Sequence, residues 1–192
     1  MKSLFDTTLP TTPLERAARD LAEYAHQELY KEGDGPQLRK YTGEPYVNHL
    51  AEVVGVLRTI QATPRMLAAA WLHDVLEDTT LGEARLRKEI GHKVADMVIA
   101  LTDSDAPGLN RAARQEATRT RLARQGAPVQ TIKLADIISN VASIVQHDPK
   151  FAKVYLPEKE AMLQVLALRG HPRLWLQARR TLEHAKAVLG TA

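Results

Sequence analysis

Residues 66–79, MLAAAWLHDVLEDT, restrict the fold of this chain more than any other stretch. The apolar run from Met66 to Leu72 has seven residues, whereas a membrane-spanning helix needs roughly 20. A helix this apolar is expected in the core of a folded domain. It is followed by four titratable residues, namely His73, Asp74, Glu77 and Asp78. A core helix can carry them only if they line an internal cleft.

The spacing of these four residues predicts a polar ridge. Residues four apart share one face of a helix, so His73 is expected to stack with Glu77. Asp74 is expected to stack with Asp78 in the same way. Three carboxylates in one cleft repel one another, and a divalent cation removes most of that cost. The ridge therefore predicts a metal site, with a chance His-Asp pair at the surface as the alternative.

The rest of the chain repeats apolar residues at helical spacing and shows no strand alternation. Capping boxes at Thr12–Glu15 and Thr80–Glu83 predict helix starts, and the first helix should run to about residue 31. Thr63-Pro64 predicts another start, with that helix continuing through WLHDVLED. The pattern indicates an all-α protein with a single compact multi-helix domain over residues 1–192. Its core is expected at about 13–169 and a C-terminal helix at about 172–189.

Composition narrows the classes of function. The chain has no cysteine, so any metal must be bound by histidine and carboxylate ligands. The net charge is only +3 and aromatic residues make up 5%, which argues against nucleic-acid binding. The N-terminal residues contain no apolar stretch long enough for a signal peptide. We therefore expect a cytoplasmic protein that does not bind a membrane.

Two further segments offer candidate ligands. The segment YTGEPYVNHL places His49 in the first turns of a predicted helix. The segment IKLADIISNV places Asp136 between apolar residues, on one helical face with Lys133 and Asn140. An aspartate in that setting is either paired with Lys133 or bound to a cation.

Together these segments resemble a known family. The order His49, His73-Asp74, Asp136 resembles the signature of HD-domain metal-dependent phosphohydrolases. The stretches RKYTGEPYVNH, AAAWLHDVLEDT, LTD and KLADIISN resemble the hydrolase domain of RelA/SpoT-type alarmone enzymes. The segment from Ser143 to Lys159 looks like the stand-alone small alarmone hydrolases. The resemblance covers roughly residues 15–159.

The resemblance implies an HD-type fold, an activity and a ligand set. The activity is hydrolysis of the 3′-pyrophosphate of (p)ppGpp to GDP or GTP and pyrophosphate. One divalent metal, usually Mn²⁺, would be bound by His49, His73, Asp74 and Asp136, although these donors suit Fe²⁺ or Zn²⁺ comparably. Glu77 and Asp78 match the acidic pair that acts on the attacking water, and either could be the base. Glu77 could instead orient a ligand histidine.

The resemblance also implies substrate contacts. Arg39 would pack against the nucleobase and Lys40 would reach a phosphate, since a guanidinium stacks well on rings. Asn140 matches a residue that binds the sugar or phosphate end, and Arg111 is our candidate for a further phosphate contact. The alternative for each is a solvated surface side chain. His26, in the first predicted helix, is expected to be a core histidine or one that supports a ligand.

Three other functions compete with this one. The first is hydrolysis of the adenosine alarmones (p)ppApp or of another nucleotide by the same kind of site. The second is a non-catalytic domain that binds alarmone, and the third is a basic helical nucleic-acid binder. A synthetase domain is not expected, because the sequence ends at Ala192. The oligomeric state, including a homo-oligomer, stays open.

Overall fold

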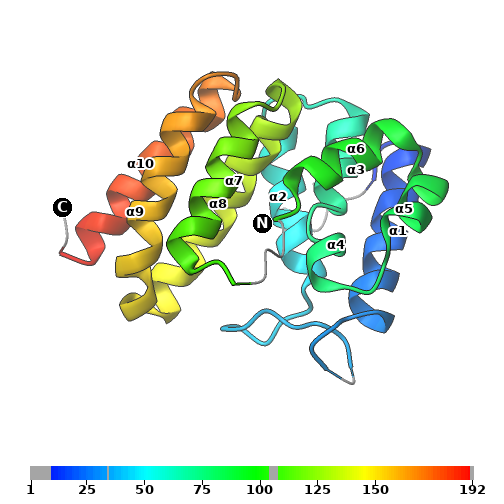
Figure 1. Cartoon of the computed structure of the whole chain (residues 1–192), viewed down its shortest axis with the longest axis horizontal. Coiled ribbons are helices and arrows are strands. Elements are labelled where there is room, and N and C mark those ends of the chain that lie inside the picture. The colour runs from blue at the N-terminus through cyan, green and yellow to red at the C-terminus, as the bar shows by residue number, and fades with distance from the viewer. Residues whose placement is uncertain (1–9, 34, 104–107, 191–192) are drawn as a thin grey trace, which may run out of the picture. The chain divides into compact units, whose positions relative to one another are not determined.

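The computed structural model describes residues 10–33, 35–103 and 108–190 and is built of α-helices (Figure 1). Within these ranges, extended pairing is limited to two isolated bridges, Tyr30 with Thr79 and Leu38 with Pro45. The predicted all-α class is confirmed. None of the described helices is long and apolar enough to cross a membrane.

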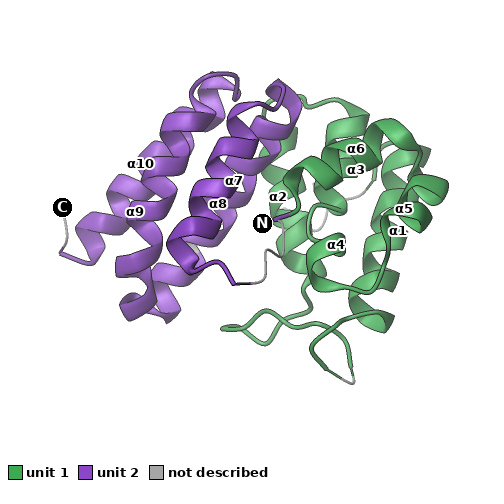
Figure 2. Ribbon diagram, in the orientation of Figure 1, with its two compact units in different colours: residues 1–102 green, residues 103–192 purple. Residues whose placement is uncertain are grey.

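The chain divides into two compact units (Figure 2). Unit 1, residues 1–102, contains α1 (Pro13–Glu28), α2 (Val47–Arg58), α3 (Pro64–Trp71), α4 (Val75–Asp78), α5 (Glu83–Ile90) and α6 (His92–Leu101). Unit 2, residues 103–192, contains α7 (Arg111–Ala123), α8 (Ala127–His147), α9 (Pro149–Leu166) and α10 (Pro172–Val188). The expectation of a single domain over the whole chain stays a prediction.

Helix α3 is the centre of unit 1. It packs against α1, α2 and α6, and its residues from Leu67 to Trp71 are buried. The three consecutive alanines allow neighbouring helices to approach closely, while Trp71 fills the remaining space. This packing confirms that the apolar run is a core helix.

The two predicted capping boxes differ in outcome. At α1 the Thr12 hydroxyl accepts a hydrogen bond from the Glu15 amide at 3.2 Å, as the pattern predicts. The Glu15 carboxylate is fully buried and accepts from the amide of Thr11, from the Trp71 indole and from Arg58. At α5 the prediction is wrong, because the helix begins at Glu83 with Gly82 as its cap. The Thr79 hydroxyl accepts from the Leu81 amide instead, which draws the chain into a turn before α5.

Unit 2 is a set of packed helices. Helix α8 contacts α9 and α10, α9 also contacts α10, and α7 lies against α9. Gly170, between α9 and α10, permits a close approach, because a Cβ there would lie 2.5 Å from the Leu166 carbonyl oxygen and 2.7 Å from Cδ1 of Leu134. The C-terminal helix ends within a residue of its predicted end, and α1 ends at Glu28, three residues before its predicted end at about 31.

Candidate metal centre and its polar network

The stretch WLHDVLED does not form one continuous helix, and that prediction is wrong. Helix α3 ends at Trp71, residues 72–74 form turns, and the short α4 begins at Val75. The reason lies in the His73 side chain, whose Nδ1 lies 2.8 Å from the carbonyl oxygen of Ala70. In a continuous helix that oxygen would accept from the Asp74 amide. His73 and Asp74 therefore lie in the turn between α3 and α4 and not on the face of a continuous helix.

This contact also sets the state of the His73 ring. A carbonyl oxygen only accepts hydrogen bonds, so Nδ1 carries the proton and, in the neutral ring, Nε2 presents a lone pair. Nε2 lies 3.0 Å from Oδ2 of Asp74. Two lone pairs at this distance repel each other unless a proton or a shared cation lies between them. Histidines that ligate metals commonly donate their other ring nitrogen to a backbone carbonyl in the same way.

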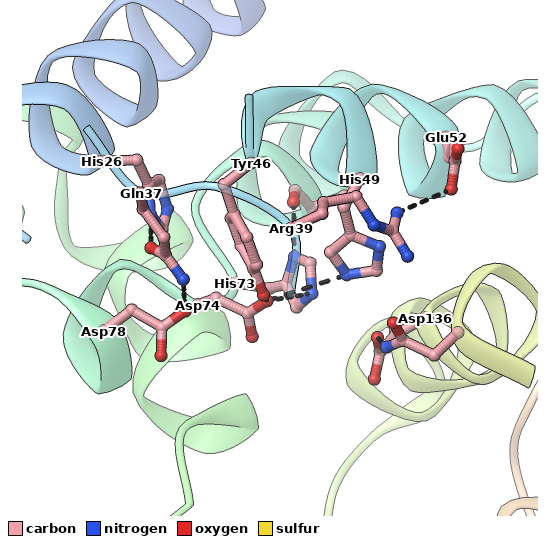
Figure 3. A network of polar contacts seen from close by, with 12 residues as sticks. His26, Gln37, Arg39, Tyr46, His49, Glu52, His73, Asp74, Asp78 and Asp136 are labelled. Carbon is pink, nitrogen blue, oxygen red and sulfur yellow. Dashed lines mark hydrogen bonds and ion pairs between the residues drawn. The ribbon is translucent and has the colours of Figure 1, made fainter. Parts of the chain in front are cut away.

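His49 supplies the third donor of unit 1. It lies in the first turn of α2 and is 1% exposed. Its ring stands edge-on to that of His73, with centroids 5.3 Å apart, and its Nε2 is 3.7 Å from Oδ2 of Asp74 (Figure 3). Ligands bound to a cation at about 2.0–2.2 Å are separated by roughly 3 Å. Two imidazoles and one carboxylate at these distances fit one divalent cation.

Asp78 has a different environment from Asp74. Gln37 donates its amide Nε2 to Oδ2 of Asp78 at 2.8 Å, and Nδ1 of His26 lies 2.6 Å from Oε1 of Gln37 (Figure 3). Burial, followed by the charge of Asp74, raises the pKa of the Asp78 carboxyl to about 6, and the bond from Gln37 opposes that shift. The carboxyl thus changes charge close to neutral pH. Carboxyl groups tuned in this way are common among catalytic acids and bases.

The last turn of α4 is held by the segment that follows α1. The Lys31 ammonium donates to the carbonyl oxygens of Leu76 and Glu77, at 3.0 and 2.8 Å. The Lys31 amide donates to the Asp78 carbonyl at 3.0 Å. The Glu77 side chain is half-buried, one residue before Asp78. These bonds fix a helix of only four residues, which would not be stable alone.

In unit 2, Asp136 lies on one face of α8 with its predicted neighbours. The Asn140 amide donates to Oδ1 of Asp136 at 2.6 Å, and Nζ of Lys133 lies 2.9 Å from Oδ2. The predicted shared face is therefore confirmed, and the structure shows the pairing with Lys133. A carboxylate held at both oxygens has one fixed orientation.

Comparison with known proteins gives the family. Residues 18–162 match the model of the HD domain. The chain belongs to the HD-domain family. It is 28% identical over 137 residues to a Synechocystis protein named probable guanosine-3′,5′-bis(diphosphate) 3′-pyrophosphohydrolase, covering 69% of this chain and 18% of the relative. It is 33% identical over 143 residues to a probable GTP pyrophosphokinase of Mycobacterium leprae, covering 70% and 17%.

A solved structure agrees with the HD fold. The structure of a metazoan ortholog of SpoT, a protein described as hydrolysing ppGpp, superposes with a TM-score of 0.77 at 23% identity, covering 94% of this chain and 98% of that one. This likeness concerns the fold. The chain spans less than a fifth of the length of the curated relatives it matches. The resemblance to RelA/SpoT-type proteins, inferred from sequence motifs, is confirmed by these relatives.

The basic pair of the HD domain lies in the loop before α2. The Arg39 amide donates to the Glu44 carbonyl at 2.8 Å, and Gly43, with φ of 70°, closes the turn. The Arg39 side chain is 9% exposed, and its Nη1 lies 3.0 Å from Oε2 of Glu52, one helical turn beyond His49. Lys40 is exposed, with its ammonium 5.1 Å above the Tyr41 ring. Arg39 is therefore not a solvated loop residue.

Arg111 is the first residue of α7 and makes two hydrogen bonds to the Glu158 carboxylate, at 2.7 and 2.8 Å. Its guanidinium also lies 4.9 Å from the centroid of the Phe151 ring. The hydrogen bond to Glu158 raises the pKa of the Arg111 guanidinium above its usual value. In this structure Arg111 joins α7 to α9, and its role as a phosphate contact stays a prediction.

Motif spacing missed two residues of the HD-domain network, Tyr46 and Gln37. Tyr46 donates its hydroxyl to Oδ2 of Asp74 at 2.6 Å, Gln37 contacts Asp78, and His26 contacts Gln37. His26 was expected to be a core or supporting histidine, and it is 3% exposed. Tyr46 and Gln37 lie within or next to the stretch RKYTGEPYVNH. Their position in or near this stretch is the one feature of the sequence that could have pointed to Tyr46 and Gln37. Helical periodicity does not help, because both residues lie outside the helices.

Proposed function

We propose that this HD domain hydrolyses the 3′-pyrophosphate of (p)ppGpp, giving GDP or GTP and pyrophosphate. The observation that carries the proposal is the convergence of His49, His73 and Asp74 in unit 1, one turn before a carboxylate held by Gln37. Relatives named for guanosine-3′,5′-bis(diphosphate) hydrolysis support the choice of substrate. A cytoplasmic location and a nucleotide as the small-molecule partner belong to the same proposal.

The proposed ligands are His49, His73, Asp74 and Asp136, and the proposed metal is one Mn²⁺. The family resemblance supports Asp136 as the fourth ligand, and the donor set by itself also suits Fe²⁺ or Zn²⁺. A divalent cation at such a site supplies Lewis acidity and neutralises negative charge on phosphoryl oxygens. Tyr46 holds Oδ2 of Asp74, and Ala70 holds Nδ1 of His73.

The acidic pair would handle the proton of the attacking water. Water oxygen bonds to the phosphorus attached to the 3′-oxygen, and the bond between that phosphorus and the 3′-oxygen breaks. The water gives one proton to the acidic pair, and the 3′-oxygen takes up one proton and leaves as a hydroxyl. Of the two carboxylates we assign the proton acceptor to Asp78. Gln37 donates to Oδ2 of Asp78 and so holds this carboxylate in one orientation, one helical turn after the proposed ligand Asp74. Glu77 would assist from the neighbouring position.

Four side chains are proposed as substrate contacts, namely Arg39, Lys40, Asn140 and Arg111. The flat guanidinium of Arg39 suits stacking on a nucleobase, and the Lys40 ammonium suits a phosphate. Arg111 would have to exchange Glu158 for a phosphate. That exchange would break both hydrogen bonds to Glu158, whose own side chain is only 16% exposed.

The test is direct. Protein loaded with Mn²⁺ is incubated with ppGpp, and the products are separated by anion exchange. We expect GDP and pyrophosphate in equal amounts. The same assay with pppApp tests the adenosine alternative. Absence of turnover with guanosine alarmone in Mn²⁺ would overturn the proposal.

A second arm tests the ligands. His73→Ala should lose both turnover and bound metal, measured by elemental analysis. His92→Ala, at an exposed histidine at the start of α6, is the matched control and should keep both. Full metal occupancy in His73→Ala would show that the ligand assignment is wrong.

A further inference from the structure

The side chain of Gln37 links a buried histidine to the Asp78 carboxylate (Figure 3). Its Oε1 lies 2.6 Å from Nδ1 of His26, and its Nε2 donates to Oδ2 of Asp78 at 2.8 Å. An amide oxygen only accepts, so Nδ1 of His26 must carry the proton. Once His26 donates to the oxygen of Gln37, the amide nitrogen can only face Asp78. A proton on Nδ1 of His26 and the acceptor-only carboxylate of Asp78 thus favour the same orientation of the Gln37 amide.

The backbone of Gln37 is held as firmly as its side chain. Its amide donates to the His26 carbonyl at 2.8 Å, and its carbonyl accepts from the Tyr46 amide at 3.0 Å. Gln37 is 8% exposed, and the ring of His26 lies 4.9 Å from that of Tyr46. The amide donor thus has a fixed position with respect to both α1 and the start of α2.

Asp78 needs such a donor because of its place in the chain. It is the last residue of the four-residue α4, and a side chain at a helix end can adopt several rotamers. Backbone bonds fix the main chain around it, namely Lys31 to the Asp78 carbonyl at 3.0 Å and Thr80 to the Leu29 carbonyl at 2.8 Å. They do not fix the direction of the carboxylate. The bond from Gln37 does.

We propose that Gln37 is a positioning residue that aims the Asp78 carboxylate, and that His26 fixes the orientation of the Gln37 amide. The inference rests on the proposed function for its catalytic meaning. The contacts themselves involve described residues of unit 1 and can be tested without turnover.

If the Gln37 side chain served only to hold the loop in place, its removal would lower stability and leave kcat unchanged. The loop is already held by the backbone bonds of Gln37, which any substitution except proline retains. Gln37→Met keeps a similar side-chain volume and removes only the amide. We expect kcat to fall about 10–100-fold, as for other misaligned catalytic groups, with KM and bound metal little changed. The melting temperature should also fall, because Nδ1 of His26 loses its buried acceptor, so kcat is compared at a temperature where both proteins are folded. Gln27→Met, an exposed glutamine on α1, is the matched control.

The role of His26 is tested by a rescue. His26→Leu should reduce kcat as much as Gln37→Met does. His26→Asn, whose side-chain amide nitrogen takes the place of Nδ1, should restore most of that loss. Because both act through one bond to Asp78, the double variant should be no slower than Gln37→Met alone. Additive losses, or losses that follow a fall in bound metal, would overturn the inference.

A measurement without turnover separates this inference from the proposed function. The side-chain amide of Gln37 gives a proton–nitrogen NMR signal that is assigned by its disappearance in Gln37→Met. That signal should move in Asp78→Asn and in His26→Leu, whereas the Gln27 signal should not. If the wild-type protein cleaves no alarmone but the signal moves, the positioning stands and the proposed substrate is wrong. If the signal stays where it is in both variants, the positioning is wrong.

Discussion

The hydroxyl of Tyr46 donates to Oδ2 of Asp74 at 2.6 Å, and the same oxygen lies 3.0 Å from Nε2 of His73. One carboxylate oxygen is therefore shared between a hydrogen-bond donor and a candidate ligand histidine. A bond of this kind fixes the direction in which the oxygen faces a cation, and the loss of such partners commonly weakens metal binding.

Tyr46→Phe should weaken metal binding without removing any ligand. Because the phenol no longer orients Asp74, we expect the dissociation constant for Mn²⁺ to rise about 10–100-fold. Calorimetric titration of metal-free protein measures it. Tyr24→Phe, at an exposed tyrosine of α1, should leave the constant unchanged. An unchanged constant in Tyr46→Phe would mean that Asp74 needs no support.

Asp78→Asn should stabilise the metal-free protein at neutral pH while abolishing hydrolysis. The pKa of Asp78 is raised from 3.8 to about 6, so the folded state binds more protons than the unfolded state between these values. The free energy of unfolding contributed by this group therefore falls as the pH rises through that window. For a half-buried group we expect a gain of about 1–2 kcal/mol at pH ~7 on removing the charge.

Urea unfolding of the metal-free protein at several pH values measures this effect. The free energy of unfolding of Asp78→Asn should exceed that of wild type by less as the pH is lowered from about 7 to about 4. At pH ~4 wild-type Asp78 is protonated in the folded state. Asp96→Asn, at an exposed aspartate of α6, controls for the change in net charge. A constant advantage at all pH values would contradict the assigned pKa shift.

Lys159→Met should stabilise unit 2 at neutral pH. The Lys159 ammonium is buried above the Tyr155 ring, and burial, followed by Lys133, lowers its pKa from 10.5 to about 8. Below pH ~8 the folded state holds a buried charge, and between about 8 and 10.5 only the unfolded state remains protonated. The contribution of Lys159 to the free energy of unfolding of the wild-type protein therefore rises with pH across that window.

The methionine variant lacks that rise and should be more stable at pH ~7 by about 2 kcal/mol. Thermal unfolding between pH ~7 and ~10 measures the difference, which should narrow at the alkaline end. Lys153→Met, at an exposed lysine of the same helix, should show neither effect. A methionine variant that is less stable than wild type at pH ~7 would show that the ammonium has a favourable partner.

Gly170→Ala should destabilise unit 2. The added methyl would lie 2.5 Å from the Leu166 carbonyl oxygen and 2.7 Å from Cδ1 of Leu134, so backbone or side chain must move. We expect a loss of about 1–3 kcal/mol in urea unfolding. Gly55→Ala in α2, where a Cβ meets nothing within 4 Å, should instead gain about 0.5–1 kcal/mol from helix propensity. Equal effects at both positions would contradict the packing argument.

Part of the candidate site could be predicted from residue type and spacing. His49, His73 and Asp74 were expected to be ligands, and the structure brings them together in unit 1. The prediction of a continuous helix through WLHDVLED is wrong, because the His73 side chain bonds to the Ala70 carbonyl and competes with the helical backbone hydrogen bond. A periodicity argument does not include that competition.

The sequence by itself determined the all-α class, the burial of LAAAW (residues 67–71) and the starts of α1 and α3, because these depend on local periodicity and on caps such as Thr12 and Thr63. Only the tertiary structure decided which side chains support the site. Tyr46 and Asp74 are 28 residues apart, and Gln37 and Asp78 are 41 apart. Helical spacing gives the face on which a residue lies. A loop residue is placed by long-range backbone bonds, so its partner is settled only when the elements pack.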